Sequence, residues 1–207
     1  MVGVYDFGGG TFDFSVVDIT ADHFRVLGFA GDAWLGGDDF DVAMAEALAN
    51  AFWRQNGVEL RERAVEWQRL LEACEVTKRA LSREAAAVLT LEAIVERPQR
   101  IDLRQTVQRS ILEQLTRPLV DRSLVLCRQV LERLGLEAQD LTQVIVTGGI
   151  TRLPFVREAV ARAFGRPIPT VVHPDEAVGL GAGLRAAQIA GHHVAGVGSP
   201  VAEAAAP

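Results

Sequence analysis

The segment Val4–Ser15 constrains this chain more than any other stretch. An apolar run reaches Asp6, breaks at three consecutive glycines and resumes at Phe12 as an alternating apolar segment. This pattern indicates two strands joined by a tight turn. Three glycines permit positive φ and leave no Cβ in the way, so backbone N–H groups can approach phosphate oxygens closely. The turn predicts a phosphate-binding loop, with an ordinary glycine-rich β-hairpin as the alternative.

Two side chains beside this turn are candidates for chemistry. Asp6, at the end of the first strand, can hold a hydrated Mg²⁺ ion through water. The hydroxyl of Thr11 follows Gly8, Gly9 and Gly10 directly, and it can reach a phosphate or an attacking water. Asp6 and Thr11 are therefore the predicted catalytic residues, and the three glycines are predicted to bind phosphate.

The segment Asp-Phe-Gly-Gly-Gly-Thr-Phe-Asp resembles the second phosphate loop of the Hsp70 chaperone ATPases, which belong to the actin-like ATPase superfamily together with sugar kinases. Further segments resemble the same family in the same order: Gly31–Asp41, Cys74–Ser82, Val144–Pro154 and His173–Val178. Several motifs in order are far more specific than any one of them. They cover about residues 2–191 and match only the second lobe of the family's two-lobed nucleotide-binding domain.

This resemblance implies an α/β fold, the ribonuclease H-like lobe of an actin-like ATPase. We expect residues 1–35 and 117–191 to form the base of the lobe. A smaller α/β subdomain is expected to be inserted at 36–116, and 192–207 to be a disordered tail. The apolar patterning itself predicts an antiparallel three-stranded meander over 2–31.

The remaining elements are predicted from periodicity and stop signals. A helix capped by Asp38 or Asp39 should end near Gly57. Further helices are expected over 60–81, 111–134 and 177–190, the last packed closely against the sheet, with strands over 85–95, 100–107, 143–147 and 171–172. Pro118 predicts a kink or a helix boundary, because a proline inside a helix costs about 3 kcal/mol.

Glu75, Lys78, Arg79 and Ser82 share one face of the helix expected over 60–81, because they are spaced i, i+3, i+4 and i+7. The resemblance implies that this face binds adenosine. Glu75 and Lys78 would bond ribose hydroxyls, Arg79 would lie over the adenine ring, and Ser82 would bond a ring nitrogen. The alternative is a solvated helix face with common charge pairs.

Gly148 and Gly149 separate a short strand from a helix that begins near Leu153, an arrangement that allows backbone to approach a ligand. The resemblance implies that both glycines lie along the purine and that Arg152 flanks it. Family members usually carry a serine at the position of Ile150, so its absence is expected to weaken affinity or selectivity for the base. Without the family, the turn is an ordinary strand-to-helix connection.

Asp175 precedes the last expected helix. The resemblance implies that it lies near the nucleotide, and a capping role in the first turn of that helix explains it equally well.

Composition excludes some classes of protein. A net charge of −6 and a pI near 5.3 argue against a nucleic-acid or anionic-membrane binder, since both need a basic surface. Cys74 and Cys127 lack metal-ligand spacing and are predicted to be buried, reduced thiols. No signal peptide or membrane span is recognised, so a cytoplasmic location is expected.

The predicted function is the adenine-nucleotide-binding half of an Hsp70-type chaperone ATPase, with ATP or ADP and Mg²⁺ as cofactors. Implied partners are nucleotide-exchange factors, J-domain co-chaperones, a first lobe and a substrate-binding domain. The first lobe's phosphate loop, its lysine for the γ-phosphate and its acidic magnesium ligands have no match here. Little ATPase activity is therefore expected from the chain alone, because phosphoryl transfer needs groups on both sides.

Three alternatives stay open at this point. A non-catalytic interaction module would bind an exchange factor or another partner through the inserted subdomain. A half-domain of a sugar or acid kinase would share the glycine-rich turn, although the helix face with Arg79 favours the chaperone branch. A filament-forming relative of actin is the weakest alternative.

Overall fold

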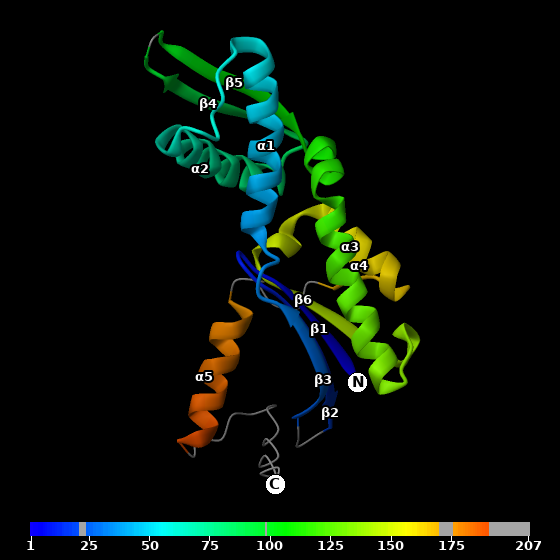
Figure 1. The fold of residues 1–207 in the computed structure, drawn as a ribbon. Coiled ribbons are helices and arrows are strands. Elements are labelled where there is room, and N and C mark those ends of the chain that lie inside the picture. Colours follow the sequence, from blue (N-terminus) through cyan, green and yellow to red (C-terminus); the bar gives the residue numbers. More distant parts are fainter. Residues whose placement is uncertain (21–23, 98, 170–175, 191–207) are drawn as a thin grey trace.

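Two sheets organise the part of the chain that the structure describes. The computed structural model describes all residues except 21–23, 98, 170–175 and 191–207 (Figure 1). In chain order, the elements are β1 (Val2–Phe7), β2 (Phe12–Ile19), β3 (Phe24–Asp32), α1 (Gly37–Asn56), α2 (Ala64–Leu81), β4 (Ala86–Val95), β5 (Ile101–Gln108), α3 (Arg109–Leu134), η1 (Ala138–Asp140), β6 (Gln143–Thr147), η2 (Gly149–Arg152), α4 (Pro154–Phe164) and α5 (Ala177–Ile189).

The larger sheet has the strand order β3-β2-β1-β6, in which β1 to β3 form an antiparallel meander. The predicted meander is therefore confirmed, while residues 21–23 of its second turn lie outside the described residues. β6 pairs in parallel with β1, and Asp6 is in register with Thr147. Because parallel strands end at the same edge of a sheet, the turn after β1 and the turn after β6 are neighbours.

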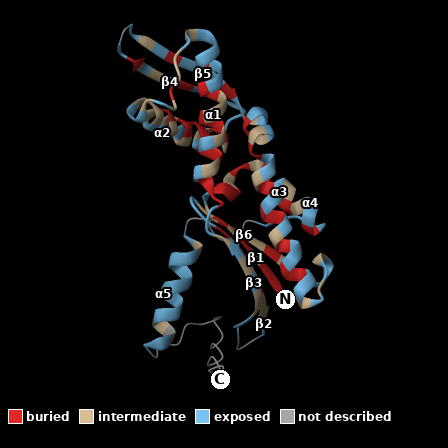
Figure 2. Ribbon diagram, viewed as in Figure 1, coloured by how far each residue is buried: buried red, intermediate tan, exposed pale blue. Residues whose placement is uncertain are grey.

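Aromatic side chains form the core between this sheet and α3. Tyr5, Phe7, Phe12 and Phe14 are fully buried, and the rings of Tyr5 and Phe12 meet edge to face with centroids 4.8 Å apart. The Tyr5 hydroxyl lies 2.6 Å from Oγ of Ser123, which ties β1 to α3. Figure 2 shows buried segments of the ribbon in the strands of the sheet and on the neighbouring part of α3.

Both cysteines are buried and unbonded to each other, as predicted. Burial raises the pKa of the Cys74 thiol to about 12 and that of Cys127 further, so neither is a thiolate at neutral pH.

The start of α1 differs from its prediction. Gly36 is the N-cap residue, and Asp39 lies in the first turn, where its Oδ2 accepts the Gly36 N–H at 2.8 Å. The prediction that Asp38 or Asp39 would be the cap is wrong, because the helix begins earlier, at Gly37. The helix ends as predicted, with Gly57 in the left-handed region at φ +68°.

A second, two-stranded sheet of β4 and β5 packs against α2, and Figure 1 shows this small layer at the far end of α1 from the main sheet. The predicted strand pair is confirmed. Its pairing is interrupted between Leu91 and Val95, where Ala93 has φ +45°. Arg69 donates to the carbonyls of Glu92 and Ala93 at 2.7 and 2.8 Å, which holds this bulge against α2.

Helix α3 joins the two sheets as one element from Arg109 to Leu134, with Pro118 inside it. The helix boundary allowed for at Pro118 is therefore not found. Proline has no N–H to donate to the Gln114 carbonyl. The other hydrogen bonds and the buried residues of α3 stabilise the helix on both sides of Pro118. The division expected at 116/117 falls within this helix, so the two subdomains remain a prediction.

The close packing expected of the last helix is not seen. A Cβ added to Gly179, Gly181 or Gly183 of α5 would meet no atom within 4 Å of the described structure. Figure 1 accordingly shows α5 apart from the sheet. The strand predicted at 171–172 and the tail predicted at 192–207 lie outside the described residues.

Candidate functional site

The three glycines after β1 form a loop that is attached to the beginning of α1. The Gly8 N–H donates to the Thr11 carbonyl at 2.9 Å and closes the turn. The carbonyls of Gly8 and Gly9 accept the N–H groups of Gly37 and Asp38 at 3.0 and 2.8 Å. Gly9, Gly10 and Thr11 are exposed beside the helix N-terminus. The N–H groups at the start of α1 are thus used by this loop and by Gly36, so the exposed amides of Gly9 and Gly10 are the groups that the loop offers to an anion.

Gly36 makes that attachment possible. A Cβ at this residue would lie 2.4 Å from both the Cα of Gly10 and the carbonyl oxygen of Gly9. Only glycine can therefore stand here without moving the loop away from α1. The glycine pair of Gly36 and Gly37 thus has a packing role in the site, beyond that of a strand-to-helix connection.

Gly148 brings the turn after β6 against the end of β1. It has φ +86°, and a Cβ on it would lie 2.3 Å from the Phe7 carbonyl oxygen and 2.7 Å from Oδ1 of Asp6. Asp6 is half-buried, and its pKa is raised by burial and then by the negative charge of Asp13, its partner on β2. A cation near Asp6 would favour its charged form.

The residues near the loop offer the implied Mg²⁺ ion the carboxylate of Asp6. Mg²⁺ often keeps several waters and uses one or two carboxylates together with phosphate oxygens. Asp6 supplies one such carboxylate beside the exposed loop of Gly9 and Gly10. Among the described residues, no group of three or more His, Cys, Asp and Glu side chains is placed to hold a metal.

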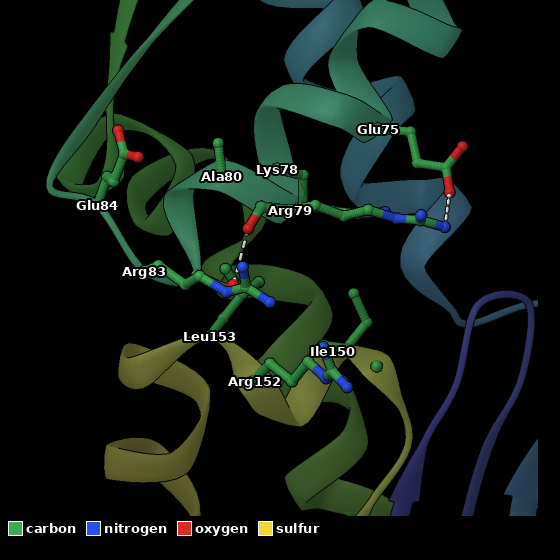
Figure 3. A pocket seen from close by; sticks show the side chains of 11 residues that line it. Glu75, Lys78, Arg79, Ala80, Arg83, Glu84, Ile150, Arg152 and Leu153 are labelled. Carbon is green, nitrogen blue, oxygen red and sulfur yellow. Dashed lines mark hydrogen bonds and ion pairs between the residues drawn. The ribbon is translucent and has the colours of Figure 1, made fainter. Parts of the chain in front are cut away.

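A cavity of about 710 Å³ lies between the end of α2 and η2 (Figure 3). Its volume is in the range of small-molecule sites, about 300–1,000 Å³. It is lined by Glu75, Lys78, Arg79, Ala80, Ser82, Arg83, Glu84, Gly149, Ile150, Arg152 and Leu153. The predicted helix face and the predicted second glycine turn, far apart in sequence, therefore border the same space.

Most predicted residues of the second glycine turn and the helix face are brought together at this cavity, and Gly148 lies beside it at Asp6. The sequence did not single out Arg83 and Glu84 as lining residues. They follow the last turn of α2, and the only available signal was that Arg83 lies four residues after Arg79. Asp175 lies outside the described residues.

The charged residues of α2 are in two different situations. Arg79 is exposed and pairs with Glu75 at 2.5 Å, while Ser82 Oγ donates to the Arg79 carbonyl at 2.7 Å. Figure 3 shows Glu75 and Arg79 along one wall and Arg152 across from them. The Glu75–Arg79 pair fits the solvated-face alternative.

Lys78 does not fit that alternative, because only 9% of it is exposed. Its ammonium donates to the Gly37 carbonyl at 2.8 Å and to Oδ2 of Asp41 at 2.6 Å. Burial raises the pKa of Asp41 to about 6 even though Lys78 favours the charged carboxylate. Asp41 was missed in the sequence, since no spacing signals a pair between two helices.

Gly37 links the glycine-rich loop to the cavity. A Cβ on it would lie 3.0 Å from Nζ of Lys78, 3.1 Å from Cδ1 of Ile150 and 3.4 Å from the Cα of Gly9. Ile150 is buried under this junction while also lining the cavity. The side chain at the departure from the family pattern is thus a packing group that offers no hydrogen bond to a ligand.

No helix among the described residues is long and apolar enough to cross a membrane.

Comparison with known proteins gives one family. The family model described as "Hsp70 protein" matches residues 1–198. The protein named "Chaperone protein DnaK" of Thermotoga petrophila is 40% identical over 190 residues, which are 91% of this chain and 32% of that protein. The proteins of the same name from Thermotoga maritima and Thermotoga neapolitana match with the same identity and coverage. The chain therefore spans about a third of the length of these curated relatives.

Proposed function

Because this chain belongs to the Hsp70 family, we propose that it forms the adenine-nucleotide-binding half of a chaperone ATPase domain. Its ligands are ATP or ADP with Mg²⁺. The observation that carries this proposal is the cavity between α2 and η2, two of whose lining residues, Lys78 and Ile150, lie against Gly37 beside the glycine-rich loop.

The two ends of this site suit the two ends of a nucleotide. The cavity has guanidinium groups on Arg79 and Arg152, which can lie against a planar base. The exposed amides of Gly9 and Gly10 in the glycine-rich loop suit phosphate oxygens. Glu75, Lys78 and Ser82 also line the cavity and can bond ribose or base.

Asp6 would hold Mg²⁺ through water and Thr11 would contact a phosphate or the attacking water, as we predict from the sequence. The metal would supply charge neutralisation for the phosphates. These groups stand on one side of the phosphates only. We therefore propose that the chain alone hydrolyses ATP slowly or not at all, because phosphoryl transfer needs groups on both sides of the phosphates.

Residues 1–35 and 117–191 would form the base of the lobe and 36–116 the inserted tip. Nucleotide-exchange factors would bind at the tip, and J-domain co-chaperones elsewhere on the complete protein. A first lobe and a substrate-binding domain would complete the chaperone.

Calorimetric titration of the folded chain with Mg-ADP tests the proposal. We expect saturable binding that weakens about tenfold in Arg79→Ala, as the loss of a desolvated cation–π contact would cause. Arg104→Ala is the matched control, because Arg104 is an exposed arginine on β5, away from the cavity, and it should bind like the unmodified chain.

Absence of binding in the folded, unmodified chain would rule out an autonomous nucleotide site. It would leave the alternative of a module that binds partners without nucleotide.

A further inference from the structure

Lys78 is the single lysine in this sequence, which contains 20 arginines. Arginine and lysine replace each other easily at exposed positions, but a compact ammonium and a planar guanidinium differ where space is limited. The one lysine stands at the junction of α1, α2 and the cavity. Its position indicates a place where the chain requires an ammonium group.

The geometry explains that requirement. An ammonium group has three N–H donors, and two of them are used by the Gly37 carbonyl and Asp41 Oδ2. Lys78 also lines the cavity, and its ammonium has no third partner among the described residues. Because Gly37 has no side chain, the ammonium can lie against the start of α1, where an added Cβ would be only 3.0 Å from Nζ.

Asp41 is held at a cost to stability. It is 5% exposed, and its Oδ1 has no hydrogen-bond partner among the described residues. The negative charges of Glu75 and Asp38 also raise the pKa of Asp41. The charge of Asp41 in turn raises the pKa of the Cys74 thiol. A buried ion pair with one unsatisfied oxygen is a poor source of stability, so a role in the site is the better explanation.

We propose that Asp41 is a positioning residue, which fixes the Lys78 ammonium between α1 and α2 so that its third N–H donates to a ribose hydroxyl. This inference rests on the proposed nucleotide site. Asp41 itself does not line the cavity, and it acts through Lys78. The same contacts join α2 to Gly37, whose N–H is bonded to the glycine-rich loop.

The single lysine permits a direct test without nucleotide. In a chain labelled with ¹⁵N-lysine, one side-chain ammonium contributes to the NMR spectrum. We expect a slowly exchanging signal in the unmodified chain, its loss in Asp41→Asn and its retention in Glu72→Gln, a matched control on the exposed side of α2. Asp41→Glu, which keeps the carboxylate, should restore the signal at least in part.

An unchanged signal in folded Asp41→Asn would overturn the proposal. If that variant does not fold, a signal in Asp41→Glu as free to exchange as that of an exposed lysine would overturn it as well.

A binding experiment tests the ribose contact. Loss of one hydrogen bond from a charged donor should weaken Mg-ADP binding about tenfold in Asp41→Asn. Binding of 2′,3′-dideoxy-ADP, which lacks both ribose hydroxyls, should change less than about twofold, since the bond is absent there. Lys78→Arg should likewise lose the preference for ADP over 2′,3′-dideoxy-ADP, and Glu72→Gln should keep that preference.

Equal losses for both ligands in Asp41→Asn would overturn the proposal and assign Asp41 to structure alone. If the unmodified chain binds neither ligand, the proposed function fails, while the ammonium signal still decides whether Asp41 positions Lys78.

Discussion

At the scale of the residue, the Asp41–Lys78 pair shows burial and attraction acting in opposite directions. Attraction to an ammonium 2.6 Å away lowers the pKa of a carboxyl, and removal from water raises it. Burial dominates here, because the pKa of Asp41 rises to about 6. The charged carboxylate is therefore less favourable in the folded chain than in the unfolded one.

This raised pKa predicts a dependence of stability on pH. Between about pH 4 and 6, folded Asp41 binds a proton that the unfolded chain, in which its pKa has the ordinary value of 3.8, does not bind. The contribution of Asp41 to the free energy of unfolding should therefore rise as the pH falls through 6. Urea unfolding should show that, between pH 7 and pH 5, the unmodified chain gains about 1 kcal/mol of unfolding free energy relative to Asp41→Asn.

Other carboxylates titrate in both proteins and cancel in this comparison. A stability difference that is equal at the two pH values would show that Asp41 keeps an ordinary pKa.

At the scale of the element, α3 contains a proline, which destabilises a helix interior. Pro118 lies in the interior of this 26-residue helix and is exposed, so its ring contributes little packing. The helix tolerates the missing hydrogen bond because its buried face, including Leu112, Thr116 and Val120, is fixed against other elements.

Replacement of Pro118 should therefore stabilise the chain. In Pro118→Ala, the restored N–H can donate to the Gln114 carbonyl, and we expect a gain of about 2 kcal/mol after the greater freedom of the unfolded chain is included. Thermal unfolding of this variant, beside Arg117→Ala at the neighbouring exposed position, provides the measurement. A decrease in stability would mean that the proline fits a local geometry that alanine disturbs.

The elements themselves were largely predictable. Glycines at 57 and 135 mark helix ends, and period-two patterning marks the meander, because both signals are local. Membership of the Hsp70 family and the actin-like α/β fold class, inferred from ordered motifs, are confirmed.

The contacts between elements could not be predicted in this way. The pairing of Asp41 with Lys78, the place of Arg83 and Glu84 in the cavity, and the position of α5 depend on how helices meet in space. No repeat or spacing in the sequence indicates which helices contact each other. The predicted roles of the site residues thus remain predictions, although many of those residues lie together.

At the scale of the whole molecule, the main sheet packs one face on α3, and its other face carries exposed apolar side chains in the part of the chain that the structure describes. Side chains alternate along a strand, so Phe14 of β2 is buried while Phe29 of β3, paired with the adjacent Ser15, is 71% exposed. Val26 is 60% exposed on the same strand. Exposed apolar side chains of this size on an edge strand favour association.

Substitution on this face should change solubility more than stability. We expect Phe29→Ser to reduce light scattering of concentrated solutions and binding of an apolar fluorescent dye. The midpoint of thermal unfolding should move little, since little buried area is lost. Phe14→Ser, on the buried face, should lower that midpoint strongly. Equal scattering by the Phe29 variant and the unmodified chain would show that this exposed face does not drive association.

The parallel pairing of β1 with β6 also bears on how the chain is made. Thr142, at the entrance to β6, bonds Met1, 141 positions away, and β1 lies between β2 and β6. On the ribosome, the β1–β2–β3 meander would leave the exit tunnel long before its fourth strand is synthesised. The centre of the sheet would then keep one unpaired edge throughout the translation of α1, α2 and α3, so a chaperone-related chain would itself need protection during its synthesis.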